Sequence, residues 1–150
     1  MKIDIRAAGS ADISQIADFN RRLAAESEGT DLDEVKITAG VAAAIEDASK
    51  GRYWLAEVDG EVVGQIMVTY EWSDWRNATI WWIQSVYVVP ACRRRGVFST
   101  LYRSVEAAAK ASGDACGLRL YVEKDNTHAQ ATYRALGMHG GTYLVMESMF

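Results

Sequence analysis

The strongest constraint on the fold is an almost continuous apolar and aromatic segment, residues 80–89, which is ended by Pro90. A strand of this composition is typical of the middle of a sheet, where both of its faces are covered. A helix is expected directly afterwards, because apolar residues recur on one face at helical spacing: Val97, Leu101, Val105 and Ala108. The pattern therefore predicts a buried strand that leads through a short turn into a helix.

The turn between this strand and this helix carries Arg93, Arg94, Arg95 and Gly96. A helix start exposes unpaired backbone N–H groups and the positive end of the helix dipole, and together these favour phosphate. Gly96 would let a phosphate approach the backbone with no Cβ in the way, and the arginines would add charge-assisted donors. The alternative is that three arginines in a turn form only a solvated run of charge.

Composition limits the class of protein. With 150 residues, of which 49% are hydrophobic and 24% charged, residues 1–150 are expected to form one globular domain with a real core. A net charge of −4 argues against general nucleic-acid binding, so the arginine cluster suits a small anionic ligand. No apolar run reaches the ~18 residues of a membrane span. Cys92 and Cys116 lack the spacing of a metal site, and a reducing cytoplasm is the expected location.

The remaining segments predict the element order β-α-α-β-β-β-α-β-α-β around one mixed α/β sheet. Asp59-Gly60 is a strong hairpin signal between two early strands. The other expected boundaries are helix starts at Ser10 or Asp12, at Asp33 and at Asp125 or Asn126, a helix stop at Gly51, a polar turn over 71–79, and strands over 117–123 and 142–149.

Four tryptophans, Trp72, Trp75, Trp81 and Trp82, are concentrated around the start of the central strand. Adjacent residues on a strand face opposite ways, so one of Trp81 and Trp82 is expected in the core and the other on the opposite face or at a cleft. Core packing is the default interpretation. The alternative is an aromatic wall around a cationic amine.

Two motifs resemble the signatures of the GCN5-related N-acetyltransferase (GNAT) family. Val88-Val89-Pro90 followed by residues 93–96 resembles a strand ending V-x-P and then [Q/R]-x-x-G-x-[G/A]. The second motif, N-x-x-A-x-x-x-Y-x-x-x-G-[F/M], is matched by Asn126, Ala129, Tyr133, Leu136, Gly137 and Met138. Phe98 departs from the first motif, because the family has Gly or Ala there. Its ring could crowd a pyrophosphate, but we expect it to turn into the core.

The resemblance implies a mostly antiparallel sheet with helices on both faces, and acetyl-CoA held where the strands 86–89 and 118–123 part. The Val88 N–H would be the oxyanion donor to the thioester carbonyl, and the N–H groups of residues 94–99 would hold the pyrophosphate. The implied cofactor-binding residues are Val86, Tyr87, Val88, Arg93, Arg94, Arg95, Gly96, Val97, Phe98, Ser99 and Asn126. No metal is expected.

Tyr133 matches the family's general acid, which gives a proton to the leaving CoA thiolate. An ordinary tyrosine has a pKa of about 10 and an ordinary thiol one of about 8.5, so full transfer runs uphill by about 2 kcal/mol. Tyr133 is therefore expected to act mainly through a hydrogen bond to the developing thiolate. The alternative is a core tyrosine with a satisfied hydroxyl.

The general base is not identified by the sequence, because Tyr121 occupies the position where some family members have a glutamate. Nearby strand residues, Glu123, Gln84, Ser85 and Tyr87, could order a water. The candidates for the acceptor site are Glu26, Glu71, Trp72 and Gln84, and Asp74 lies in the same loop region as Glu71. Each carboxylate is otherwise interpreted as a solvated surface group.

The resulting functional prediction is an acetyl-CoA-dependent transfer of an acetyl group to a primary amine, with a small molecule favoured as acceptor over a protein N-terminus or lysine. A catalytically weak acyl-CoA-binding regulatory module is the alternative. Nucleic-acid binding through the arginine cluster is disfavoured by the acidic charge balance, and no membrane partner is expected. An open sheet edge or the last strand could support a homodimer.

Overall fold

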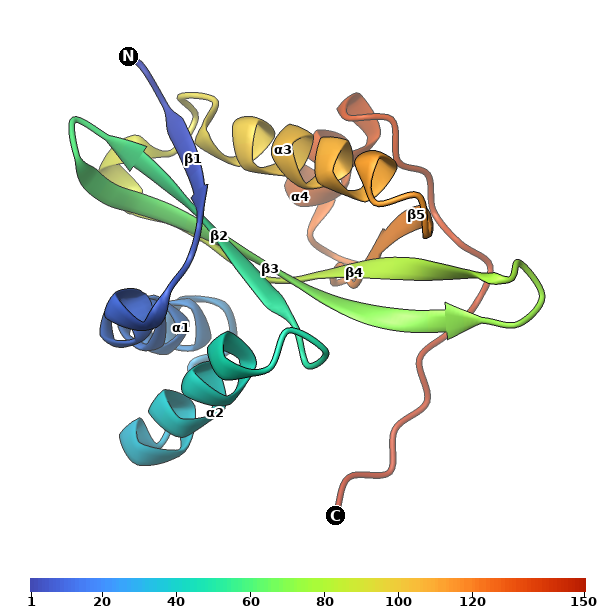
Figure 1. The fold of residues 1–150 in the computed structure, drawn as a ribbon, viewed down its shortest axis with the longest axis horizontal. Helices are drawn as coiled ribbons and strands as arrows, with labels where there is room; N and C mark the ends of the chain where they lie inside the picture. The colour runs from blue at the N-terminus through green and yellow to red at the C-terminus, as the bar shows by residue number, and fades with distance from the viewer.

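A five-stranded sheet in the order β1-β2-β3-β4-β5 forms the middle layer of the computed structural model, which describes all 150 residues (Figure 1). The first four strands pair antiparallel, whereas β4 and β5 run parallel. The bounds are β1 (Asp4–Ala7), β2 (Arg52–Val58), β3 (Glu61–Ser73), β4 (Ala78–Val88) and β5 (Ala115–Leu120). The predicted α/β class with one mixed sheet is confirmed.

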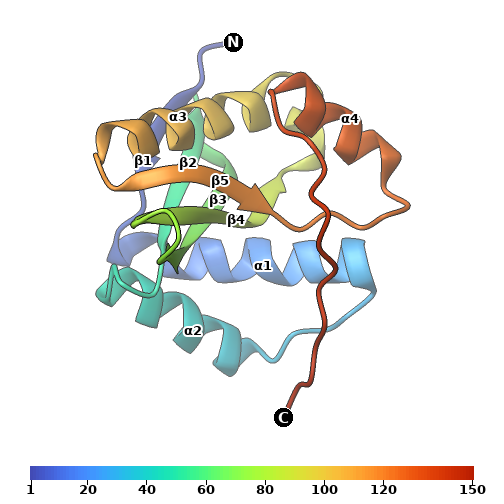
Figure 2. The same ribbon diagram turned by 90° about the vertical axis from the view of Figure 1, so that its right-hand side faces the viewer.

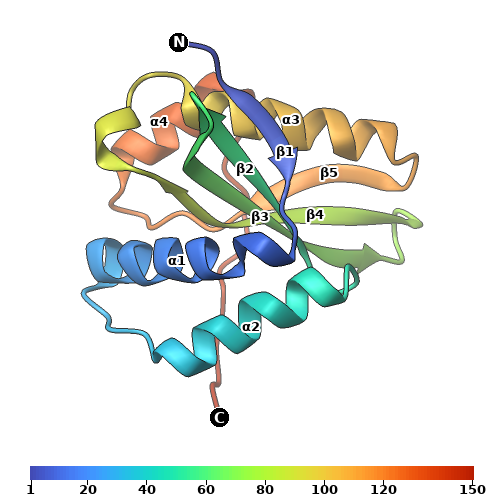
Figure 3. The same cartoon turned by 60° about the vertical axis from the view of Figure 1, so that its left-hand side comes forward.

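Helices cover both faces of this sheet, as Figure 3 shows. One face carries α1 (Ile13–Glu28) and α2 (Glu34–Glu46), and the other carries α3 (Val97–Ala111) and α4 (Thr127–Ala135). Short 3-10 turns precede α1 (Ser10–Asp12) and follow β4 (Pro90–Cys92). None of the helices combines the length and the apolar character needed to cross a membrane.

Each face of the sheet has its own apolar core. The larger cluster, between the sheet and α3, includes Trp81 and Leu101. The smaller one, between the sheet and the helices α1 and α2, includes Ile16 and Leu55. Trp82 is absent from both and points to the face opposite Trp81, so the prediction that the two rings diverge is confirmed. Apolar side chains on both faces of β4 explain its almost continuous hydrophobic sequence.

The predicted helix starts at Asp33 and at Asn126 are confirmed, and both residues cap their helices. The Asp33 carboxylate accepts a hydrogen bond from the Lys36 N–H at 2.8 Å, and the Asn126 side chain accepts one from the Ala129 N–H at 3.1 Å. Each satisfies one of the N–H groups that a helix start leaves unpaired. Asp12 stands at the N-cap of α1, but its side chain makes no capping bond there.

Gly51 does not end α2, contrary to the prediction. The helix ends at Glu46 with Asp47 as its cap, and Gly51 lies buried beside β3. A Cβ atom at Gly51 would stand 2.7 Å from Met67 Cε and 2.9 Å from the Val68 carbonyl oxygen. Glycine is required here by close packing against a strand, and not by a left-handed helix cap.

Three other predicted boundaries are wrong. The strands β3 and β4 extend further than expected, so the turn is shorter than 71–79. The strand predicted over 117–123 runs from Ala115 to Leu120. Residues 142–149 form no strand, and none of their backbone groups is hydrogen-bonded to the rest of the chain. This last segment crosses the end of β5 and does not run alongside it (Figure 2), so the outer edge of β5 stays unpaired.

Replacing Gly51 with alanine tests this packing. Gly51→Ala is expected to lower the free energy of unfolding by about 1–3 kcal/mol, because the added methyl group overlaps a strand carbonyl that cannot move freely. Gly40→Ala is the matched control: it lies inside α2 with nothing within 4 Å of the new Cβ. That change should raise stability by about 0.5–1 kcal/mol through helix propensity. Urea unfolding measures the free energy of unfolding of both variants. Equal changes in the two variants would contradict the requirement for glycine at position 51.

Candidate active site

The strand β4 carries a bulge at the point where the site begins. Met67 pairs with Gln84 and Gln65 pairs with Tyr87, so β4 has one more residue than β3 between these two pairs. Ser85 in this interval has a left-handed backbone with φ of 48°. An extra residue of this kind bends the strand and increases its local twist.

A buried pair of amide side chains holds this bulge from the α1 face. Gln65 is fully buried, and its Nε2 donates to the Ser85 carbonyl oxygen at 3.0 Å and to Asn20 Oδ1 at 3.1 Å. Asn20 lies on α1 and is also buried. Gln65 Oε1 has no hydrogen-bond partner in the protein. The two amides therefore connect a helix to the left-handed residue of β4 and fix the place where the strand bends.

Beyond the bulge, β4 and β5 separate. The last pair in their parallel register joins Ile83 to Leu120, so the end of β4 has β3 as a neighbour on one side only. The Val89 N–H donates to the Val63 carbonyl oxygen at 2.9 Å. The alternation of an antiparallel ladder then directs the N–H and C=O groups of Val88 away from β3 and into the gap between the strands.

The start of α3 presents a run of free backbone N–H groups. Arg94 and Gly96 both have left-handed backbones, with φ of 60° and 84°, in a turn of the kind whose N–H groups converge on an anion. No N–H group of residues 94–99 donates a hydrogen bond within the protein. The first donor of the helix is Thr100, which bonds the Gly96 carbonyl oxygen at 3.0 Å. These donors fit a diphosphate, which offers several oxygens to a helix N-terminus.

Arg93 is directed toward β4 and α1, away from the free N–H groups. Its Nε donates to the Val88 carbonyl oxygen at 2.8 Å, and its Nη2 donates to Glu26 Oε2 at 2.7 Å. The Tyr87 hydroxyl reaches the other oxygen of Glu26 at 3.4 Å. Arg93 therefore ties the turn to the strand and to α1, while the other two arginines of the turn are exposed and form no ion pair.

Tyr133 lies on α4 and faces α3. Its ring meets the Phe98 ring edge-on, with centroids 5.8 Å apart, and burial raises the pKa of the Tyr133 hydroxyl. Phe98 also contacts the Tyr102 ring at 6.2 Å and packs against the larger core, so its ring turns inward as expected. Asn126 uses its side-chain oxygen to cap α4, which leaves its NH2 group free to donate.

A second group of polar and aromatic side chains lies on the α1 face of the sheet. Glu71 accepts hydrogen bonds from Trp82 Nε1 at 2.9 Å and from Arg119 Nη1 at 3.2 Å. The Trp82 ring lies 4.5 Å from the Tyr121 ring, and the Gln84 side chain donates to the Thr69 hydroxyl. Side chains alternate between the two faces of the sheet along β3, β4 and β5, and these side chains all fall on the same face.

The candidate acceptor residues are thus only partly brought together. Glu71 and Gln84 share the α1 face, and Glu26 lies on the last turns of α1 next to Tyr87. Trp72 is exposed and, one residue from Glu71, points to the other face of the sheet. Each of the two carboxylates forms an ion pair with an arginine, Glu26 with Arg93 and Glu71 with Arg119.

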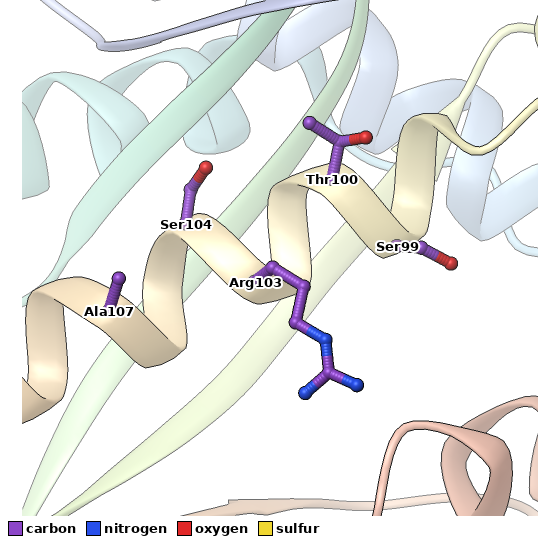
Figure 4. A pocket seen from close by; sticks show the side chains of 5 residues that line it. All are labelled: Ser99, Thr100, Arg103, Ser104 and Ala107. Atoms are coloured by element: carbon purple, nitrogen blue, oxygen red, sulfur yellow. The ribbon is translucent and has the colours of Figure 1, made fainter.

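Two hollows adjoin these groups. A shallow one of about 430 Å³ lies along the outer face of α3 and is lined by Ser99, Thr100, Arg103, Ser104 and Ala107 (Figure 4). A larger one of about 1020 Å³ extends along β5 and is lined by Trp82, Leu120, Tyr133 and part of the segment after α4. The side chain of Tyr133 therefore borders the larger cavity.

The family model for the acetyltransferase (GNAT) family matches residues 15–138. The solved structure of a possible acetyltransferase from Clostridium difficile 630 is 45% identical and covers 100% of this chain and 99% of its own, with a TM-score of 0.92. No curated protein sequence matches the chain.

More distant structures share the fold. A predicted acetyltransferase from Clostridium acetobutylicum, solved with acetyl-CoA, is 16% identical and has a TM-score of 0.80, with 98% of this chain and 96% of that chain covered. AAC(6')-Iy, solved with the bisubstrate analog CoA-S-monomethyl-acetylneamine, is 17% identical and has a TM-score of 0.79. The match covers 100% of this chain and 99% of that chain.

The fold, the parted strands and these matches together define the protein as an acyltransferase. The chain belongs to the GNAT family of acetyltransferases.

Three residues of the site had no role in the sequence analysis. Gln65 could have been noticed as the one polar side chain in the apolar run 62–68. Asn20 falls on the inner face of its helix, which is a signal for a buried polar partner. Nothing in the sequence near Arg119 indicates a role at the site, because its pairing with Glu71 depends on two strands that only the fold brings together.

Removing the Gln65 amide tests its role at the bulge. Gln65→Leu leaves the Ser85 carbonyl and the Asn20 side chain without their donor, so the free energy of unfolding should fall by about 1–3 kcal/mol. Gln65→Glu keeps the size but replaces the donor with a carboxylate oxygen, and it should be at least as destabilising. Gln15→Leu, on the exposed side of α1, is the control and should stay within about 0.5 kcal/mol. Urea denaturation measures all three, and a neutral Gln65→Leu variant would contradict the role.

Proposed function

We propose that the protein transfers the acetyl group of acetyl-CoA to the primary amine of a small molecule by direct attack. The observation that carries this proposal is the run of unpaired N–H groups over residues 94–99 beside the gap between β4 and β5. It supports a diphosphate on α3 and a pantetheine arm along β4, where that arm would add to the strand through backbone hydrogen bonds. The bisubstrate complex of AAC(6')-Iy supports a small-molecule amine as acceptor.

The reaction forms a C–N bond and breaks a C–S bond. The neutral amine attacks the thioester carbonyl carbon, and the Val88 N–H, directed into the gap, would donate to the carbonyl oxygen as negative charge develops. One preorganised donor of this kind contributes about 3–4 kcal/mol of transition-state stabilisation. The attacking nitrogen, which is an ammonium in the tetrahedral intermediate, loses a proton to water, and the C–S bond breaks with its electron pair on sulfur to give the amide and the CoA thiolate.

Tyr133 would stabilise the departing thiolate. Burial raises the pKa of its hydroxyl above the ordinary value of 10.0, so the group stays protonated and able to donate at neutral pH. The same shift makes complete proton transfer to a thiolate of ordinary basicity less favourable. A hydrogen bond that strengthens as charge develops on sulfur is therefore the role that fits this environment.

No carboxylate is assigned as general base. Glu26 is bound by Arg93 and Glu71 by Arg119, so both are committed to structural ion pairs. The acceptor is then expected to react as the fraction of amine that is neutral in solution. This favours acceptors whose amine has a pKa not far above the working pH.

The test of this function is a CoA-release assay with acetyl-CoA and a panel of small primary amines, run beside calorimetry of CoA binding. We expect heat on adding CoA and turnover with at least one amine. Binding without turnover on any amine, or on a lysine peptide, would favour the acyl-CoA-binding module. Absence of heat with the folded protein would contradict the proposal as a whole.

The Tyr133→Phe variant is expected to lower kcat by about 10²–10³-fold, the usual cost of removing one hydrogen bond to developing negative charge, with a much smaller change in the KM for acetyl-CoA. Tyr102→Phe is the matched control, because Tyr102 also contacts the Phe98 ring and its pKa is also raised by burial. Steady-state kinetics on both variants, with folding checked by thermal unfolding, gives the comparison. Equal losses in the two variants would assign Tyr133 to packing alone.

A further inference from the structure

A patch of ring and guanidinium side chains is left uncovered on the α1 face, next to the gap between β4 and β5. Trp82 and Arg119 are paired in the parallel register of the two strands, one step before that register ends at Ile83 and Leu120. Tyr121 follows directly beyond the end of β5. On this face α1 lies against β4, whereas β5 lies farther from it (Figure 2). Arg119 is therefore only half-buried, and Tyr121 is exposed. We call Trp82, Arg119 and Tyr121 the open patch.

Two aromatic rings form the floor of the open patch. The Trp82 and Tyr121 rings have their centroids 4.5 Å apart and an angle of 37° between their planes. Trp82 Nε1 donates to Glu71 Oε1 at 2.9 Å, which fixes the indole and uses its only donor. The pair therefore offers apolar ring surface, and such surface suits a planar or apolar part of a ligand.

Arg119 adds hydrogen-bond donors that the protein leaves unused. Its Nη1 donates to Glu71 Oε2 at 3.2 Å, and neither its Nε nor its Nη2 has a partner in the protein. A guanidinium carries several donors in a fixed fork that matches a carboxylate. Glu71, by contrast, already accepts a hydrogen bond at each of its oxygens. The unused hydrogen-bonding capacity of the group therefore lies mainly on the donor side.

Basic side chains also predominate along the larger cavity, which includes the open patch. Its basic lining residues are Arg76, Lys110, Arg119 and Arg134. Glu106 is the one acidic residue of the lining and pairs with Lys110, whereas Arg76 and Arg134 form no ion pair. In a protein with a net charge of −4, this is a local excess of positive charge. It attracts an anionic group and disfavours a ligand with several ammonium groups.

We propose that the open patch binds the acceptor and selects an amine that also carries a carboxylate. This inference rests on the proposed function. With the diphosphate at the start of α3, the acyl end of acetyl-CoA would pass through the gap toward the α1 face. The amine would then lie at the gap, and an apolar part of the acceptor would lie on the Trp82 and Tyr121 rings. Its carboxylate would accept from Nε and Nη2 of Arg119 in a charge-assisted, bidentate pair.

Calorimetry with two matched amines tests this selection. The probes are 4-(aminomethyl)benzoate and 4-(aminomethyl)benzamide, which share a ring and a primary amine and differ in charge. Each is titrated into protein saturated with CoA, which has no acetyl group to transfer. We expect the benzoate to bind at least about 10-fold more tightly than the benzamide, as a hydrogen bond between charged groups provides. This preference should disappear in Arg119→Gln.

Two further variants serve as controls. Arg76→Gln removes another basic residue of the same cavity that forms no ion pair, so it should keep most of the preference if contact, and not the general field, is responsible. Glu71→Gln keeps Arg119 and an oxygen that can accept from Trp82 Nε1, so it should also keep the preference. This variant decides the case if Arg119→Gln does not fold.

The inference would be overturned if neither probe bound, or if the benzoate bound no better than the benzamide. It would also be overturned by equal losses of preference in Arg119→Gln and Arg76→Gln, or by its loss in Glu71→Gln. Failure of the proposed function has a different result. A carboxylate preference without turnover on any amine would leave the patch intact and contradict acetyl transfer. Turnover without that preference would leave acetyl transfer intact and contradict the patch.

Discussion

The buried hydrogen bonds of Gln65 are the interaction on which the site depends. A strand in the middle of a sheet normally offers its backbone groups to neighbours on both sides, and β4 does so only as far as Ile83. The bulge at Ser85, held by Gln65 from the neighbouring strand and Asn20 from α1, bends β4 where its partner β5 ends. Backbone groups that would otherwise complete the ladder are thereby left for a ligand, and the sheet remains intact on the side of β3.

Backbone donors, more than charged side chains, define the proposed anion site. The protein as a whole is acidic, with a net charge of −4, and one of the three arginines, Arg93, is bound to Glu26 and to the Val88 carbonyl. The unpaired N–H groups of residues 94–99 are fixed by the fold and lose no side-chain entropy on binding. Arg93 instead links the turn before α3 to β4 and to α1. A shift of β4 or α1 would therefore also move the proposed anion site.

Local sequence patterns predicted most of the fold, and the family resemblance supplied the residues that are proposed to bind acetyl-CoA. The hairpin at Asp59-Gly60, the caps at Asp33 and Asn126 and the helix after Gly96 each follow from short-range chemistry that the structure retains. The errors concern long-range contacts. Gly51 was interpreted as a helix stop because a glycine after an apolar stripe is typical of one, whereas its actual constraint is a carbonyl on β3. The pairing of Glu71 with Arg119 likewise depends on strand order, which no local pattern contains.

The segment 142–149 differs from these errors in its physical cause. Its composition favours a strand, but a strand exists only where another edge accepts its hydrogen bonds. Within one chain the segment crosses the end of β5, and its apolar side chains stay exposed beside a cavity that its own sheet does not fill. The strand preference of this segment is therefore unmet in the structure, although the outer edge of β5 is also unpaired.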